Sequence, residues 1–149
     1  MKQLLAMAAG CLVVCGASAS IRADQSGSEV NQQLAQARAA AARFHDPNEA
    51  LADGYTDMGA NPEEGGAIEF VNFNLVDCTL DQAHPEALRY VPSGNGLRLV
   101  AVEFAIPMAC PGAPPEDFLP GTGEWEQEPD APVWILGVQI WSGKSGEAQ

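Results

Sequence analysis

The order of the hydrophobic patterns constrains the fold of this chain most. Helical periodicity occurs only before Gly54, and strand-like runs occur only from Ala67 onward. Such a sequence of helices followed by strands is typical of an α+β domain. Apolar residues recur at steps of three and four over 28–44, which predicts an amphipathic helix; they are Val30, Leu34, Ala37, Ala41 and Phe44.

A second, shorter helix is predicted directly after the first. Asp46 is a suitable N-cap and Pro47 a suitable first helical residue, while Gly54 ends the pattern. The following residues, 57–66, read as a loop.

Four runs after this loop have strand-like composition, namely 67–71, 87–91, 97–106 and 133–141. The second and third flank a five-residue loop and predict a hairpin. We therefore expect two N-terminal helices packed on an antiparallel sheet of about four strands. A more specific alternative is a cone-shaped sheet around a pocket, which resembles nuclear-transport-factor-like domains.

The segment 107–132 is rich in proline and glycine and contains six acidic residues but no basic one. A loop of this length in a small domain is either functional or disordered, and we expect a solvated flap. Its carboxylates lack the spacing of an EF-hand calcium loop.

The N-terminus has the pattern of a secretory signal peptide over 1–19: Lys2, then an apolar run over 4–14, then Ala17 and Ala19 flanking Ser18. The apolar run is too short to span a bilayer as a helix. We expect cleavage before Ser20, a flexible tether over 20–27, one domain over 28–141 and a polar tail over 142–149. The expected location is periplasmic or secreted, without membrane insertion; Cys11 and Cys15 fit a lipidation signal poorly.

Charge and cysteine content limit the partners and the compartment. The formal net charge is −13, which disfavours nucleic acid and anionic lipid as partners. Removal of the signal peptide leaves Cys78 and Cys110 as the remaining cysteines. In an oxidising compartment this pair predicts a disulfide, and two buried free thiols are the alternative.

Three polar residues interrupt predicted strands that are otherwise apolar: Glu69, Glu103 and Gln139. A half-buried carboxylate must be paired, hydrogen-bonded or protonated. Two carboxylates that face one cavity would suit general acid/base catalysis. Alternatively, they pair with Arg89 or Arg98 across the hairpin.

Established catalytic motifs are missing from the chain: it has no nucleophile elbow, phosphate loop, CxxC or HExxH pattern. His45 adjoins a helix cap and His84 precedes a proline in a loop, so we expect both to be structural or solvated.

The middle of the chain resembles a family of exported bacterial proteins of unknown function. The resemblance runs in order through Phe44-His45-Asp46-Pro47, Gly54-Tyr55, Val71-Asn72, Leu75-Val76-Asp77, Pro85-Glu86-Ala87-Leu88, Tyr90, Asn95-Gly96 and Leu97 to Phe104. It implies a metal site made of histidines and the glutamate that matches Glu103. Here the histidine positions hold Glu69, Gln127, Trp134 and Gln139, or Val138 in place of Gln139. We therefore expect no metal and no cofactor.

The favoured function is an exported binding or interaction domain without catalysis, whose partner is an unknown small molecule or protein. The alternative is a small acid/base or metal-assisted enzyme that uses Glu69 and Glu103. Whether Glu69, Glu103 and Gln139 face one cavity discriminates between the two.

Overall fold

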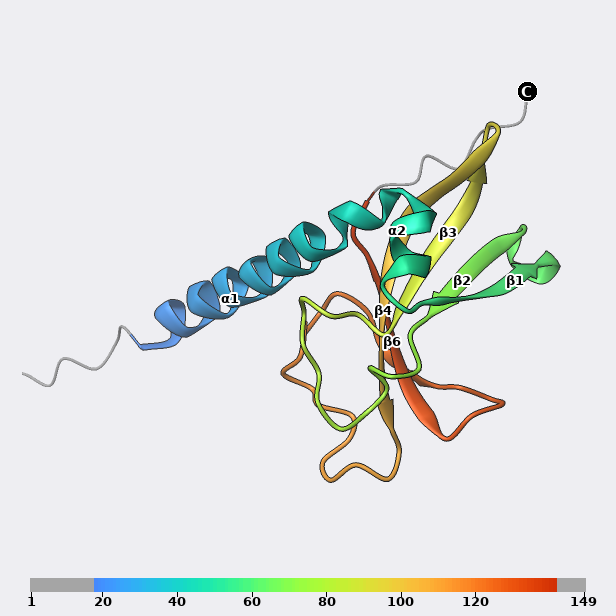
Figure 1. Ribbon diagram of the computed structural model, residues 1–149. Helices are drawn as coiled ribbons and strands as arrows, with labels where there is room; N and C mark the ends of the chain where they lie inside the picture. Colours follow the sequence, from blue (N-terminus) through green and yellow to red (C-terminus); the bar gives the residue numbers. More distant parts are fainter. Residues whose placement is uncertain (1–17, 142–149) are drawn as a thin grey trace, which may run out of the picture.

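The chain folds as an α+β domain in which one long helix precedes a six-stranded antiparallel sheet (Figure 1). The computed structural model describes residues 18–141. The predicted signal peptide, apart from its last two residues, and the predicted polar tail lie outside this range. Helix α1 spans Ser18–Ala41 and continues as the 3-10 turn η1, Ala42–His45. The short helix α2, Pro47–Ala52, follows.

The strands are β1 (Thr56–Asn61), β2 (Ala67–Val71), β3 (Ala87–Ser93), β4 (Gly96–Pro107), β5 (Trp125–Gln127) and β6 (Val133–Gln139). A 3-10 turn η2, Pro62–Glu64, separates the first two. The strand order in the sheet is β1-β2-β3-β4-β6-β5, and all neighbours are antiparallel.

The expectation of two helices on about four strands is wrong in detail. The second helix has only six residues, and α1 is the one extended helix. Strands β1 and β5 lie in segments expected to be loops. Both are edge strands held by pairing with one neighbour, and all six residues of β1 are exposed, so neither shows the apolar alternation that marks a strand.

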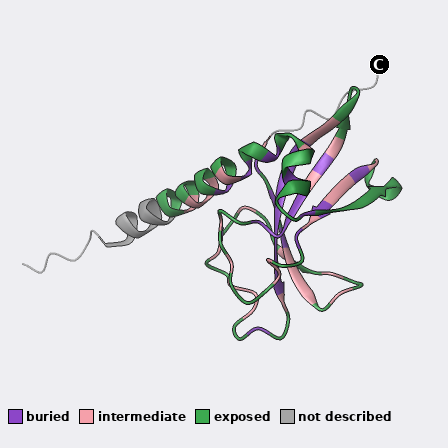
Figure 2. Ribbon diagram, in the orientation of Figure 1, coloured by how far each residue is buried: buried purple, intermediate pink, exposed green. Residues whose placement is uncertain are grey.

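Helix α1 begins ten residues before the expected start at Ser28 and includes 20–27, the segment interpreted as a tether. Alanine and glutamine favour helix, and one glycine within the segment is tolerated. Most of α1 extends away from the sheet, and its exposed side is plain in Figure 2. Within residues 18–141, no helix combines the length and apolar character that a membrane span requires.

The core lies between one face of the sheet and the helical segment around η1. Phe44 and Tyr90 belong to this core, and the Tyr90 hydroxyl donates a 2.7 Å hydrogen bond to the Phe44 carbonyl. This bond joins η1 to β3 inside the apolar interior. The other large side chains on this face are Phe70, Leu88, Leu99, Val102, Phe104, Leu136 and Val138.

Several local expectations are confirmed. Asp46 caps α2 by accepting a hydrogen bond from the Asn48 N–H, with Pro47 at the first helical position. The hairpin forms, although Ser93 pairs with Gly96 and the loop has two residues instead of five. Cys78 and Cys110 form a disulfide with Cα atoms 5.5 Å apart, which joins the β2–β3 connection to the loop after β4.

Candidate functional site

The sheet face opposite the core carries the candidate site. In an antiparallel sheet, residues that pair directly across strands point to the same face. One such row runs from Glu69 to Arg89 and Ala101 and ends at Gln139. The next row places Glu103 opposite Gly137. This face thus presents charged side chains among alanines and a glycine.

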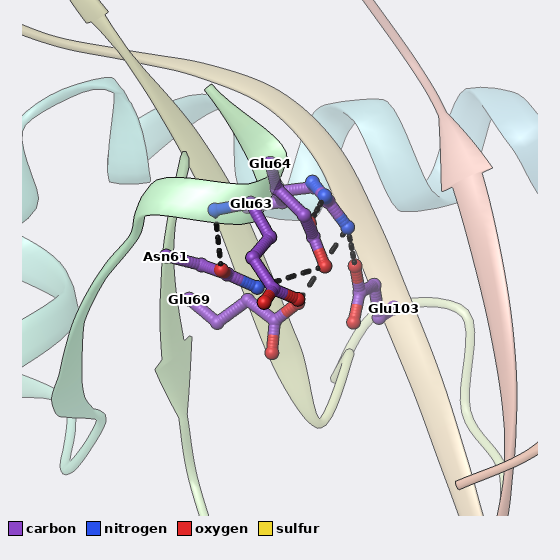
Figure 3. Close-up of polar contacts among 6 residues, drawn as sticks. Asn61, Glu63, Glu64, Glu69 and Glu103 are labelled. Carbon is purple, nitrogen blue, oxygen red and sulfur yellow. Dashed lines mark hydrogen bonds and ion pairs between the residues drawn. The ribbon is translucent and has the colours of Figure 1, made fainter. Parts of the chain in front are cut away.

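Arg89 lies at the centre of an ion-pair cluster. Its guanidinium contacts Glu69 Oε1 at 3.5 Å and Glu103 Oε1 at 3.4 Å, and it makes a close ion pair with Glu64. Figure 3 shows Glu64, Glu69 and Glu103 converging from separate elements: the end of η2, β2 and β4. Three carboxylates therefore share one positive charge.

A cavity of about 480 Å³ lies between this face and the acidic loop. Its volume falls in the range of small-molecule sites, about 300 to 1,000 Å³. Strand β5 pairs with β6 and thereby fixes the loop as one wall of the cavity. The lining residues are Glu64, Arg89, Glu103, Gly123, Glu124, Glu126, Gln127, Glu128, Pro129, Ile135 and Gly137.

Two glycines shape the cavity. A Cβ at Gly123 would lie 2.7 Å from the Gly137 carbonyl oxygen, so only glycine allows the loop to approach β6 this closely. A Cβ at Gly137 would meet no atom within 4 Å. Because Gly137 pairs with Glu103, a side chain at 137 would occupy the space beside that carboxylate.

The electrostatic environment favours protonation of the paired carboxyls. Burial raises the pKa of Glu69 to about 7, and the nearby charges of Glu103 and Glu128 add to this effect. Burial also raises the pKa of Glu103, against the opposing effect of the Arg89 guanidinium. Glu103 is only 7% exposed, and of its two oxygens only Oε1 has a hydrogen-bond partner among residues 18–141.

The three residues singled out from the sequence share this face but do not share one cavity. Glu103 lines the cavity, and Glu69 lies beside it on the other side of Arg89. Gln139 is exposed three strands away from Glu69, about 14 Å at the usual strand spacing, and donates to the Trp141 carbonyl. The alternative that the glutamates pair with Arg89 is confirmed, whereas Arg98 takes no part.

The positions where the resembled family has histidines lie in different parts of the sheet. Gln127 lines the cavity. Trp134 on β6 pairs with Gln127 on β5 and with Ile106 on β4, whereas Val138 is in the core. Among residues 18–141, no group of three or more histidine, cysteine, aspartate or glutamate side chains has the geometry to hold a metal ion. His84 is exposed and contacts Asp81 at 2.9 Å.

Sequence reasoning missed three contributors to the site: Glu64, Gly137 and the wall formed by the acidic loop. An isolated glycine inside a predicted strand was an available signal for Gly137, since it marks a close approach or an open space. Glu64 and the loop carry no such signal, because their places depend on the pairing of β1 and β5. It also missed the buried carboxyl of Glu86, which is 1% exposed.

The comparisons with known proteins gave no match. No protein-family model matches the chain, and neither a curated protein nor a solved structure matches it.

Proposed function

We propose that this chain is an exported binding domain that takes a small molecule into the cavity between the sheet and the acidic loop, without catalysing a reaction. The carrying observation is the guanidinium of Arg89 between Glu69 and Glu103. It occupies the position in which a substrate would have to meet both carboxylates. A cavity of about 480 Å³ remains beside this cluster and is sufficient for a small ligand.

The export part of the proposal rests on the signal-peptide pattern and on the disulfide. A disulfide between Cys78 and Cys110 is typical of proteins that fold in an oxidising compartment. Membership of the resembled exported family is part of the same proposal. So is the more specific description of the sheet as a cone around a pocket.

An acid/base enzyme is the second candidate, and one observation favours it. The raised pKa values of Glu69 and Glu103 are a property of general acids and bases that act near neutral pH. Arg89 would then hold the two groups in place while one of them exchanges a proton with a substrate.

Ligand-observed NMR distinguishes these functions. A library of small metabolites is mixed with the protein and with Gly137→Val, whose added side chain would fill the cavity beside Glu103. For a binding domain, we expect compounds that contact the protein but not the variant, and that are unchanged after a day. Accumulation of a product, stopped by Glu69→Gln, would establish the enzyme instead.

A further inference from the structure

The cavity has an excess of negative charge that its own arginine does not balance. Five of its lining residues are glutamates and one, Arg89, is basic. Four of the glutamates come from two places at the rim of the cavity: Glu64 at the end of η2, and Glu124, Glu126 and Glu128 in and beside the edge strand β5. An anionic ligand would therefore be repelled on entry.

One carboxylate in the cavity is built to receive a ligand. Glu103 is more than nine-tenths buried, its contact with Arg89 is long at 3.4 Å, and its second oxygen has no hydrogen-bond partner among residues 18–141. Among residues 18–141, the buried side-chain nitrogen or oxygen that lacks a hydrogen-bond partner is Arg98 Nε, so the second oxygen of Glu103 is not fully enclosed and stays accessible from the cavity that Glu103 lines. Glu103 thus retains an acceptor position that faces the cavity.

The space beside this acceptor is open. Gly137 is the direct cross-strand neighbour of Glu103, and a Cβ there would meet nothing within 4 Å. A β-branched side chain would be favoured in this position by strand propensity. The absence of a side chain leaves room for a compact head group next to the carboxylate, with Ile135 on the same lining.

Resting on the proposed function, we infer that the ligand is a small organic cation whose ammonium or guanidinium group donates to Glu103 in the space over Gly137. The glutamates of η2 and the β5 wall surround the rest of the molecule with negative charge. Arg89 remains paired with Glu64 and Glu69 and does not have to leave.

This assignment makes binding depend on pH. The groups that face Glu103 are Arg89 on β3, Glu69 on β2, Glu64 at η2, and Glu124, Glu126 and Glu128 on the wall. Burial raises the pKa of Glu103, and it brings the pKa of the neighbouring Glu69 to about 7, so Glu69 is partly protonated in neutral solution. A cation binds the ionised form better and releases that proton. Affinity therefore increases as pH rises from about 6 to about 8.

Calorimetric titration with three four-carbon probes tests the inference. Diaminobutane is cationic, butanediol is neutral and succinate is anionic. At low salt and about pH 8 we expect saturable binding of diaminobutane alone. Glu103→Gln should weaken it by at least about tenfold, since it removes a charged hydrogen-bond acceptor. Glu29→Gln, which changes the net charge equally on an exposed face of α1, should leave it unchanged.

A second variant separates this inference from the proposed function. Gly137→Val adds no charge, and no atom obstructs its Cβ, so the fold should persist while diaminobutane binding is lost. If butanediol or succinate binds and this variant abolishes it, the cavity is a binding site but the ligand is not a cation. If the variant leaves the binding of every probe intact, the cavity is not the site and both proposals fail.

Two further measurements address the proton and the source of the head group. Binding heats in buffers of different ionisation enthalpy should show proton release near pH 7, where Glu69 is partly protonated; identical heats would contradict the coupling of binding to this proton. Trilysine in the same titration offers the same ammonium group on a peptide. Tighter binding of trilysine than of diaminobutane would assign the head group to a lysine side chain, and weaker binding to a free amine; either result supports the cation.

Discussion

The Glu86 carboxyl accepts a 3.1 Å hydrogen bond from the backbone N–H of Ala105 inside the core. Glu86 directly precedes β3, and the pairing of Ala87 with Glu103 is the first of the β3–β4 ladder. The side chain thus supplies the next partner for β4 where the backbone ladder ends. Burial exceeds the effect of this hydrogen bond and raises the pKa of Glu86 to about 8.

Glu86 should make the protein less stable in alkaline solution. The folded chain keeps the proton up to about pH 8, whereas an unfolded glutamate releases it near 4.5. The stabilisation from this proton is therefore complete below about pH 4.5 and is lost as pH rises through about 8. Glu86→Gln should reduce the fall in melting temperature between about pH 5 and 8.5. The exposed Glu116→Gln is the control, and an equal fall in both variants would contradict this role.

The buried tyrosine hydroxyls should each contribute to stability. Tyr90 donates to the Phe44 carbonyl at 2.7 Å, and Tyr55 donates to the Pro85 carbonyl at 2.6 Å. Tyr90→Phe and Tyr55→Phe leave a buried carbonyl without its donor and should each lower the free energy of unfolding by about 1 to 3 kcal/mol. Urea denaturation measures the loss. Phe73→Ala, at a side chain that is mostly exposed, should change it little.

The disulfide should be a major source of stability. It closes a loop across a sequence separation of 32, for which chain entropy predicts about 3 to 4 kcal/mol. The double variant Cys78→Ser with Cys110→Ser should unfold at correspondingly lower urea concentration. A thiol assay on the protein without substitutions, after denaturation, should detect no free thiol from this pair. Two reactive thiols from Cys78 and Cys110 would show that the bond does not form.

Zinc should not stabilise the protein. The positions that the family resemblance associates with histidine hold carboxylate, amide and indole groups, and Glu103 is engaged by Arg89. Amide and indole groups are poor zinc ligands. We expect equal melting temperatures with and without zinc, and at most slight stabilisation by magnesium or calcium. A zinc-dependent rise that Glu103→Ala abolishes would support a metal-assisted enzyme.

The exported chain should begin at Ser20, because Ala17 and Ala19 flank Ser18 in the pattern that signal peptidase cleaves. Intact-mass measurement of protein recovered outside the cytoplasm checks this start. A mass equal to that of the full chain, or one that includes a lipid on Cys11, would refute it.

The sequence predicts the elements whose own residues carry a pattern. Strand β2 and the β3–β4 hairpin follow from apolar alternation and turn chemistry, and α2 follows from its cap at Asp46. Strands β1 and β5 could not be predicted in this way, because their residues are mostly exposed and each strand is held by backbone pairing with one neighbour at the edge of the sheet.

In the candidate site, too, only the residues that stand out in their own strand could be predicted. Glu69 and Glu103 were visible as charges in apolar strands, and Arg89 as their partner across the hairpin. The cavity was not visible, since it depends on where the acidic loop crosses β6. Alternation along a strand predicts which face of the sheet a residue is on, but not its position on that face. Gln139 is on the same face as Glu69, yet it lies three strands away, at about 14 Å.

The position of β5 at the edge of the sheet has a consequence for association between copies of the chain. An unpaired strand edge is a template for the strand of another molecule, and charged side chains discourage such pairing. Glu126 lies in β5, with Glu124 and Glu128 directly beside it. Two such edges would bring like charges together, so the same glutamates that line the cavity also oppose aggregation through this edge.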